Sequence, residues 1–267
     1  MRVIAVTNQK GGVGKTTTTQ HVAAALGEMG ERVLAVDLDA QATLTMASGI
    51  KVDSLAASVY QVLVAESRSI SDVIVTTDQG YDLAPADPDM GDADIHLRAR
   101  KLNWHLTLAR ALEGVADNYD WCLIDCPPAL TALTVNALQA ANEILIPVSP
   151  EAWPVKGMQR LFECIGEMRE TNKQLRVAGI IPTLVRRDRS HTEMLDRLHD
   201  LFPEADITAP VPVSAHFSRA ARATTTVLHR APTSAGAEAY RSIAQQLRNY
   251  DERAVLGSRV ALKGALR

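Results

Sequence analysis

The sequence predicts an α/β fold in which helices cover both faces of a central, mostly parallel, twisted sheet. Two observations lead to this prediction: short apolar runs alternate with segments of helical periodicity, and a glycine-rich loop follows the first apolar run directly. Strands that alternate with helices form parallel sheets that are buried on both sides. A chain of 267 residues, 46% hydrophobic and 22% charged, is long enough to bury such a core.

Five apolar runs have the length and composition of buried strands. Each contains four or five consecutive residues that are nearly all apolar, as expected for a strand that is covered on both faces. Gly/Pro-rich or polar segments separate each run from the helical segment that follows it. The predicted strands are residues 3–6, 33–36, 121–124, 144–148 and 177–181.

Apolar residues at helical spacing fill the segments between these strands. The first stripe, at Val22, Ala25, Leu26 and Met29, follows the i, i+3, i+4, i+7 pattern of a helix with one buried side. The segment 48–94 is the least regular part of the chain. Further stripes occur at Leu108, Leu112 and Val115; at Met158, Leu161, Phe162 and Ile165; at Met194, Leu195, Leu198 and Leu201; and at Ala237, Tyr240, Ala244 and Leu247.

Domain organisation follows from what the chain lacks. It shows no internal repeat, no low-complexity tract and no long linker. We therefore expect a single domain at residues 1–250 and a short basic tail at residues 251–267.

Composition and charge exclude several classes of protein. Lysine and arginine number 28 and aspartate and glutamate 31, so the net charge of −3 excludes a globally basic nucleic-acid-binding protein but permits a local basic face. Aromatic residues make up only 4%, which argues against a surface built on base stacking. Three cysteines give no disulfide framework. No apolar run approaches the roughly 18 residues of a membrane-spanning helix, and the start lacks a signal-peptide core, so we expect a cytoplasmic protein.

A glycine-rich loop joins the first predicted strand to the first predicted helix, which is the position of a phosphate-binding loop. Its glycines allow successive backbone N–H groups to face an anion, and the helix N-terminus adds further donors. Lys15 is placed to reach the β- and γ-phosphates, Thr16 to coordinate Mg²⁺ and Thr17 to contact the α-phosphate. The predicted nucleotide-binding loop consists of Lys10, Gly11, Gly12, Val13, Gly14, Lys15, Thr16 and Thr17.

This loop departs from the usual GxxxxGK[ST] pattern, because Gln9 stands at the first glycine position and Lys10 precedes the glycines. It resembles the deviant Walker A motif of the ParA/MinD family of ATPases. The resemblance implies a fold of the P-loop NTPase type. It also implies that Lys10 crosses a dimer interface to the nucleotide of the other subunit.

Two aspartates, Asp37 and Asp39, follow the second predicted strand. In a parallel sheet this strand end lies at the same edge as the phosphate loop, so Asp39 is placed to hold a Mg²⁺-bound or attacking water. The segment resembles the family's DxDPQ pattern, in which the second aspartate supports hydrolysis, with Ala40 in place of the proline. The alternative for either aspartate is a helix N-cap.

Asp125 follows four apolar residues, which is the Walker B pattern, and its carboxylate is expected to bind Mg²⁺, through water. Together with Thr16 and Asp39 it completes the predicted metal site. The two prolines after it direct the chain away from the strand. Cys122 and Cys126 flank Asp125, as would suit an iron–sulfur site, but only one of them can lie on each side of the strand end.

The resemblance to ParA proteins extends over most of the chain. Four segments match in order and spacing: NQKGGVGKTTT, VDLDAQ, LIDCPPALTALTVNAL and ANEILIPVSPEAWPVKGMQRL. Two later segments, AGIIPTLVRRDRSH and PVPVSAHFSRA, resemble the parts of the family near the adenine and the DNA, and they assign Thr183 and Pro212 to nucleotide contact. Here Val213, His216 and Arg219 stand where the family has arginine, arginine and glutamate.

Arginines gather in two loop-like stretches of the second half, where acidic residues are sparse. If the fold brings these stretches together, they form a local face that binds phosphates. The resemblance implies that this face binds DNA without sequence preference, whereas the alternative is a rim of ordinary surface charges. The predicted DNA-binding residues are Arg186, Arg187, Arg189, Arg219 and Arg222.

The resemblance implies a partition ATPase, closest to short, Soj-like ParA proteins. Such a protein would bind ATP and Mg²⁺, form an ATP-dependent homodimer, bind DNA nonspecifically and hydrolyse ATP slowly, with Lys10, Lys15 and Asp39 as catalytic residues. A ParB-like partner is expected to accelerate turnover. The protein would associate with the nucleoid while it moves a plasmid, a chromosome region or another cargo.

Two alternatives stay open at this point. A MinD-like positioning ATPase would bind a membrane through residues 251–267, but Gly257 and Gly264 weaken a helix there and the apolar positions form no single stripe. A metabolic enzyme, either an electron donor that resembles nitrogenase reductase or a small-molecule kinase, would hold iron or make a phosphorylated product.

Overall fold

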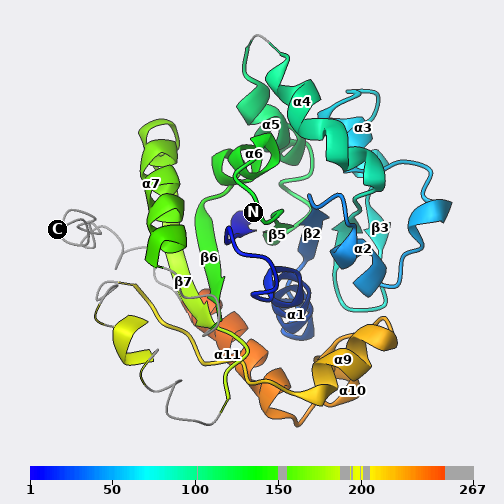
Figure 1. The fold of residues 1–267 in the computed structure, drawn as a ribbon. Helices are drawn as coiled ribbons and strands as arrows, with labels where there is room; N and C mark the ends of the chain where they lie inside the picture. The colour runs from blue at the N-terminus through cyan, green and yellow to red at the C-terminus, as the bar shows by residue number, and fades with distance from the viewer. Residues whose placement is uncertain are drawn as a thin grey trace.

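A seven-stranded, twisted sheet lies at the centre of the molecule (Figure 1). The computed structural model describes residues 1–100, 102–149, 155–186, 193, 195–198, 200 and 205–249. The strands in these residues are β1 (Arg2–Val6), β2 (Val33–Asp37), β3 (Val75–Thr76), β4 (Asp82–Ala84), β5 (Trp121–Asp125), β6 (Glu143–Val148) and β7 (Arg176–Pro182). Their order is β3-β4-β2-β5-β1-β6-β7, and only the β3–β4 pair is antiparallel.

The predicted mostly parallel sheet is therefore confirmed. Each of the five predicted strands coincides with β1, β2, β5, β6 or β7 to within one residue at either end. Strands β3 and β4 were not predicted, because strands of two and three residues are too short to show a pattern of their own.

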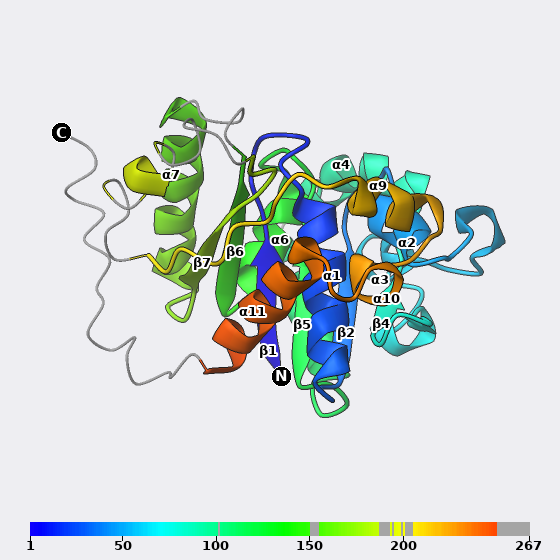
Figure 2. The same cartoon turned by 90° about the horizontal axis from the view of Figure 1, so that it is seen from below.

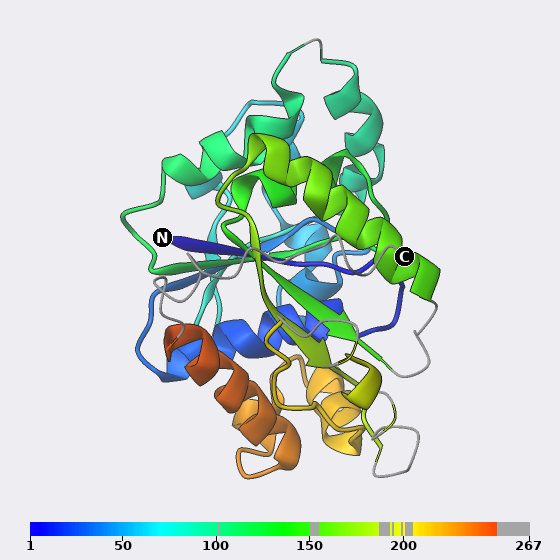
Figure 3. The same cartoon turned by 90° about the vertical axis from the view of Figure 1, so that its left-hand side faces the viewer.

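Helices cover both faces of the sheet, as Figure 3 shows. One face carries α1 (Lys15–Glu28), α9 (Ala215–Arg222), α10 (Val227–Arg230) and α11 (Ala235–Asn249). The other carries α4 (Ala93–Arg98), α5 (Thr107–Glu113), α6 (Ala132–Ala140) and α7 (Val155–Thr171). Each layer packs its apolar side chains into a core of its own against the sheet. This burial on both faces explains why the central strands are continuously apolar.

Short elements fill the region between β2 and β5, in agreement with the irregular pattern of residues 48–94. They connect the end of β2 to the antiparallel edge of the sheet and then to the layer of α4 and α5. These elements are α2 (Thr43–Ala47), η1 (Val52–Ser54), α3 (Val59–Leu63), η2 (Ile70–Asp72), η3 (Pro88–Asp92) and η4 (Trp104–Leu106).

The predicted apolar stripes fall on α1, α5, α7 and α11. Their buried members contribute to the two cores. Val115 lies just beyond the end of α5. In the stripe at residues 194–201, Met194 and Leu201 lie outside the described residues.

The assignment of one domain to residues 1–250 and of a tail to residues 251–267 stays a prediction, because residues 250–267 lie outside the described part of the chain. In the part that is described, both cores pack on the same sheet. Among those residues, none of the helices has the length and apolar character needed to cross a membrane.

Helix α1 packs closely against the connection between β3 and β4. A Cβ atom on Gly27, near the end of α1, would clash with the carbonyl oxygen of Gly80 in that connection. Gly80 itself has φ 84°, a left-handed conformation that glycine adopts without strain. Two glycines therefore allow the two backbones to touch.

His21 joins α1 to the helices that lie beyond it. Its Nδ1 donates to the carbonyl oxygen of Thr17 at 2.8 Å, and its Nε2 accepts from the backbone N–H of Val227 at 3.1 Å, at the start of α10. Its ring stacks on Tyr240 of α11, with 4.9 Å between ring centroids. These contacts require a neutral ring with the proton on Nδ1. Complete burial lowers the pKa of His21 to about 4.

Replacing Gly27 with alanine should lower the free energy of unfolding by about 1–3 kcal/mol, the usual cost of overpacking. The matched control is Gly166→Ala in α7, where an added Cβ meets no atom within 4 Å. Because alanine favours helix more than glycine, this control should be neutral or stabilising by up to ~1 kcal/mol. Urea unfolding measures both variants, and equal stabilities would contradict the close packing at Gly27.

The His21→Gln variant keeps one donor and one acceptor but cannot titrate. The pKa of His21 in the folded protein, about 4, lies below its ordinary value of 6.5. Between these pH values the His21 ring binds more protons in the unfolded state than in the folded state. The free energy of unfolding of the wild type therefore increases as pH rises. The unfolding free energy of the wild type minus that of the variant should increase by about 3 kcal/mol from pH 4 to pH 6.5. Urea unfolding across this range checks the result, and a constant difference would contradict it.

Candidate nucleotide-binding site

The candidate site is built where the carboxyl ends of β1, β5 and β2 meet at one edge of the sheet. In the parallel register, Val6 pairs with Asp125, and Asp125 pairs with Asp37. The connection after β1 leads toward β2, whereas the connection after β6 leads toward β7 in the opposite direction. Such a reversal opens a crevice at the strand ends, where α/β proteins bind ligands. The fold thus places the phosphate loop and both acidic segments at one crevice.

The loop between β1 and α1 has the backbone that an anion-binding loop requires. Gly12 and Gly14 have φ 76° and 87°, which are left-handed conformations. A Cβ atom on Gly11 or Gly12 would meet no atom within 4 Å, so the loop backbone is open to a ligand there. Gly14 precedes α1, whose first turn has neither a side-chain cap nor an acidic residue. The N–H groups of that first turn can therefore serve a phosphate.

Two hydrogen bonds brace this loop against the carboxyl ends of β6 and β7. Asn8 donates from Nδ2 to the carbonyl of Pro147 in β6 at 2.8 Å and accepts from the backbone N–H of Lys10 at 3.1 Å. Thr183, which follows β7, donates from its hydroxyl to the carbonyl of Val13 at 2.7 Å. The hydrogen bond of Asn8 joins the loop after β1 to the neighbouring strand β6. We did not predict Asn8 from the sequence; its only signal is its place two residues after a buried strand.

The two residues that we assigned to nucleotide contact in the second half lie on neighbouring segments. Val185, two residues after Thr183, forms a parallel bridge with Pro212. The backbone N–H of Val185 donates to the carbonyl of Val211 at 3.0 Å, and that of Val213 donates to Val185 at 2.8 Å. Thr183 is buried and Pro212 is half-buried. The structure therefore joins these segments and places the Thr183 hydroxyl on the loop backbone.

The two lysines of the loop have different environments. Lys15 is 7% exposed, and its Nζ donates to the carbonyl of Lys10 at 3.3 Å. Burial lowers the pKa of Lys15, while the charges of Asp125, Cys126 and Asp39 raise it. Lys10 is exposed on the loop. Lys15 thus points into the acidic crevice of its own chain, and Lys10 lies at its surface.

Asp125 is buried against the loop and lacks a full set of partners. Its Oδ1 accepts from the Thr19 hydroxyl at 3.4 Å, while its Oδ2 is buried without a hydrogen-bond partner. Burial raises the pKa of Asp125, the nearby charge of Asp37 raises it further, and a hydrogen bond from Thr16 opposes the shift. A carboxylate oxygen without a partner and an adjacent threonine hydroxyl suit Mg²⁺, which takes oxygen ligands. Thr16 and Asp125, two of the predicted metal residues, therefore lie together.

Asp37 and Asp39 differ in role despite their proximity. Asp37 is fully buried and accepts hydrogen bonds from Thr45 N at 2.9 Å, from the Thr45 hydroxyl at 2.8 Å and from Asp39 N at 3.1 Å. Burial raises the pKa of Asp37 to about 6. Asp39 is half-buried and accepts from Gln41 N at 3.0 Å. Ala42 stands at the N-cap position of α2, so neither aspartate occupies it, but Asp37 holds the first turn of that helix through Thr45. Asp39 stays near Lys15 and Asp125.

No group of three or more His, Cys, Asp and Glu side chains in the described residues could hold a metal ion alone. Cys122 and Cys126 are both buried, and burial raises the pKa of both thiols. A buried thiol with a raised pKa is a poor metal ligand, because the thiolate is the ligand form.

The predicted DNA-binding residues are only partly described. Arg219 and Arg222 are exposed in the last turn of α9, a helix without an acidic residue. Arg186 is exposed and follows Val185, which bonds to the segment that leads into α9. Arg187 and Arg189 lie outside the described residues. Arg186, which begins the first arginine stretch, thus follows a residue that is hydrogen-bonded to Val213. Val213 lies just before α9, which carries Arg219 and Arg222.

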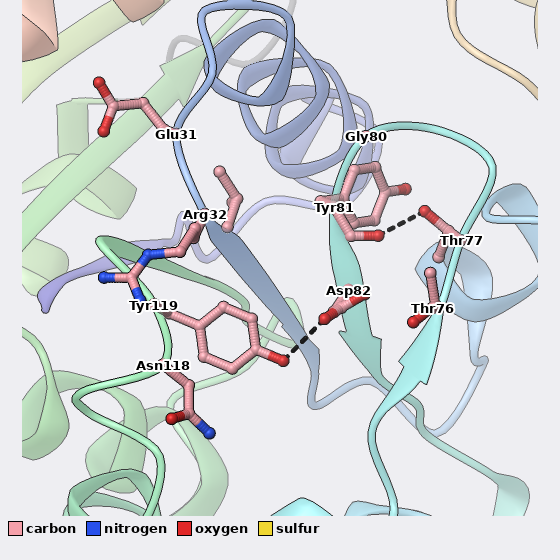
Figure 4. A pocket seen from close by; sticks show the side chains of 10 residues that line it. Glu31, Arg32, Thr76, Thr77, Gly80, Tyr81, Asp82, Asn118 and Tyr119 are labelled. Carbon is pink, nitrogen blue, oxygen red and sulfur yellow. Dashed lines mark hydrogen bonds between the residues drawn. The ribbon is translucent and has the colours of Figure 1, made fainter.

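A separate pocket of about 430 Å³ lies at the opposite edge of the sheet, near the amino ends of β2, β4 and β5 (Figure 4). The Tyr119 hydroxyl donates to Asp82 there at 2.8 Å. Arg32 at its rim pairs with Asp120. This pocket does not belong to the phosphate loop.

The fold and the site define a P-loop nucleotide-binding protein with a second lysine in its phosphate loop. Residues 1–177 match a family model described as an AAA domain. The sporulation initiation inhibitor protein Soj of Bacillus subtilis is 34% identical over 248 residues, 92% of this chain and 98% of Soj. The chromosome partitioning protein ParA of Caulobacter vibrioides is 34% identical over 251 residues, 92% of this chain and 94% of that protein. The chain belongs to the ParA/MinD family of ATPases.

A solved structure is also similar over most of the chain. It is described as cobyrinic acid a,c-diamide synthase from Mycobacterium smegmatis with bound ADP and magnesium. The two structures align with a TM-score of 0.80 and 36% sequence identity, and the aligned region covers 92% of this chain and 93% of the synthase chain. The same protein was solved with an ATP analogue and magnesium.

The Lys15→Gln variant should lose nucleotide affinity by about 100-fold or more, because it removes charge-assisted hydrogen bonds to the phosphates. Titration with a fluorescent ADP analogue measures the effect. The matched control is Lys10→Ala in the same loop, which should bind ADP like the wild type because Lys10 lies at the surface. Tight ADP binding by Lys15→Gln would contradict the assignment of the loop.

Proposed function

We propose that this protein is a partition ATPase of the ParA type, which binds Mg-ATP, dimerises in the ATP state, binds DNA without sequence preference and hydrolyses ATP slowly. The observation that carries the proposal is the contrast between the two lysines of the phosphate loop. Lys15 is buried beside the acids of its own crevice, whereas Lys10 is exposed. A lysine at the surface of the loop is placed to serve a nucleotide in a second subunit.

In the proposed reaction, positioning and charge neutralisation do most of the work. Lys15 and the first turn of α1 would hold the β- and γ-phosphates. Thr16 and Asp125 would hold Mg²⁺, which neutralises charge on the phosphates. Asp39 would orient the attacking water, and Lys10 of the other subunit would stabilise charge that develops on the bridging oxygen. Asp37 accepts two hydrogen bonds from Thr45 of α2 and one from the backbone of Asp39, so its carboxylate is engaged and is not free to act as a base.

The proposed DNA contact resides mainly on α9. Arg219 and Arg222 are exposed there, and the helix has no acidic residue to oppose them. Arg186, Arg187 and Arg189 belong to the same proposed surface. Because the net charge of the chain is −3, DNA affinity must come from a local face and must depend on salt. Dimerisation would double this face and so couple DNA affinity to ATP.

The proposed cargo and partner follow from the relatives. Soj and ParA are named for sporulation control and chromosome partitioning. By analogy, a ParB-like partner would stimulate hydrolysis, and the protein would work on the nucleoid in the cytoplasm.

A second candidate function follows from the similar structure described as a diamide synthase. Formation of an amide from a carboxylate requires ATP and a source of ammonia. Ammonia release from glutamine by a cysteine needs a thiolate near neutral pH. The pKa of each of the three cysteines, Cys122, Cys126 and Cys164, is raised by burial. The chain's cysteines therefore favour the partition ATPase over a glutamine-dependent synthase.

A DNA-binding titration with ADP, ATP and a slowly hydrolysed ATP analogue tests the proposal. We expect tight, salt-dependent binding with the analogue and weak binding with ADP. The same titration against liposomes tests the MinD-like alternative, and a product assay with glutamine and a carboxylate acceptor tests the synthase. DNA binding that does not depend on nucleotide would contradict the proposal.

Replacing Arg219 and Arg222 together by glutamate should weaken DNA binding in the ATP state and reduce the slope of log K against log salt by about 2, one for each lost phosphate contact. The matched control replaces Arg110 and Arg160 by glutamate; these two arginines are exposed on α5 and α7, on the other face of the sheet. Both double variants change the net charge equally, so equal losses of affinity would indicate a global charge effect and not a face on α9.

A further inference from the structure

A buried amide lies where three elements of the molecule meet. Gln79, in the connection between β3 and β4, is 3% exposed. Its Nε2 donates to the carbonyl oxygens of Ala47 and Thr224, both at 2.9 Å. Its Oε1 accepts from Gln20 Nε2 at 2.9 Å and from the Tyr81 hydroxyl at 3.3 Å. All four hydrogen-bonding positions of this amide are therefore used.

The partners of Gln79 belong to the elements that carry the candidate sites. Gln20 lies in α1, which begins in the phosphate loop. Ala47 ends α2, which follows the loop of Asp39. Thr224 follows α9, which carries the exposed arginines. Figure 2 shows α1, α2 and α9 gathered in one part of the molecule. One side chain thus connects three functional elements that are distant in sequence.

The backbone at the end of α9 depends on an external partner. Thr224 has φ 46°, a left-handed conformation that is favourable for glycine and costly for threonine. The N–H groups of Thr224 and Thr225 donate to the carbonyls of Ala221 and Ala220, which closes the C-terminus of the helix. The bond from Gln79 to the Thr224 carbonyl stabilises this turn from outside the helix.

The same amide fixes the end of α2. The Ala47 carbonyl accepts from both Gln20 and Gln79, at a helix end where carbonyls lack partners within the helix. Near the start of α2, Asp37 accepts from the backbone and the hydroxyl of Thr45. This short helix is thus held by an acid of the nucleotide edge on one side and by the two glutamines on the other. A displacement of the acidic loop therefore reaches Gln79 through a single helix of five residues.

We propose that Gln79 is a positioning residue that fixes α9 relative to α1 and α2, so that the nucleotide state sets the DNA affinity of Arg219 and Arg222. This inference rests on the proposed function. A purely structural amide would contribute to stability and leave the dependence of DNA binding on nucleotide unchanged. The test must therefore separate stability from that dependence.

Two substitutions of Gln79 remove its contacts in different ways. Gln79→Glu has nearly the same shape, but it replaces both donors with an oxygen that faces the carbonyls of Ala47 and Thr224. Gln79→Met removes all four hydrogen bonds without adding a charge. In both variants, the ratio of DNA affinity with the slow ATP analogue to that with ADP should fall about tenfold. Dimerisation with the analogue, measured by sedimentation, should stay as in the wild type, because neither variant touches the phosphate loop.

The matched control is Asn172→Asp, which makes the same amide-to-acid change away from α9. Asn172 Nδ2 donates to the carbonyls of Leu138, Gln139 and Ala141, between α6 and α7. This variant should lose thermal stability and keep the wild-type ratio of DNA affinities. Wild-type ratios in both Gln79 variants would overturn the inference while the proposed function stands. Absence of ATP-dependent DNA binding in the wild type would overturn the proposed function and this inference with it.

Hydrogen exchange on the wild type provides a test that needs no variant. Amides at residues 43–48 and 215–225 should change their protection together when ADP is replaced by the slow ATP analogue. The control region is residues 132–141, in α6 on the other face of the sheet, which should not follow them. If the protection of residues 215–225 changes without a change at residues 43–48, or the reverse, the inference is overturned.

Discussion

Two aspartates on neighbouring strands, Asp37 and Asp125, are buried side by side at the carboxyl edge of the sheet, and the rest of the site depends on how their charges are accommodated. Burial raises the pKa of both carboxyl groups. The charge of Asp39 raises the pKa of Asp37 further, and the charge of Asp37 raises that of Asp125. Three hydrogen bonds satisfy Asp37 and make it an anchor for α2. Asp125 keeps a buried oxygen without a partner. In the proposed function, this division leaves one carboxylate for structure and one for a cation, and Lys15 lies near Asp125 and Asp39.

Helix α1 extends this constraint across the molecule. Its N-terminus lies at the candidate anion site, and its buried residues contact the elements beyond it. His21 contacts α10 and α11, Gln20 contacts α2, and Gly27 touches the β3–β4 connection. Protein interiors are close-packed, so a shift of such a helix cannot be absorbed locally. The proposed link between binding at the phosphate loop and the position of the arginine helix would run through this one element.

Much of this arrangement could be predicted from the sequence, because it depends on local patterns. The central strands are apolar runs, and the phosphate loop and Asp125 follow strands directly, so strand ends and motifs locate the site together. Neither aspartate stands at the N-cap position of α2, which is Ala42, but Asp37 accepts the backbone N–H of Thr45 in the first turn of that helix. Asn8 and Gln79 escaped prediction because their partners lie 139 and 145 residues away in the sequence. Such contacts leave no periodicity or spacing in the chain.

Because the net charge is −3, the proposed DNA binding requires the exposed arginines of α9 to act as a local surface. A coupling free energy of about 1–3 kcal/mol is typical of linked sites, and it corresponds to one or two buried hydrogen bonds. Gln79 donates two such bonds. One goes to Ala47, at the end of the helix that follows the acidic loop, and the other goes to Thr224, just after the helix that carries the arginines. The cost of the left-handed Thr224 is of similar size. A small change at the nucleotide edge is therefore energetically sufficient to change how α9 presents its charges.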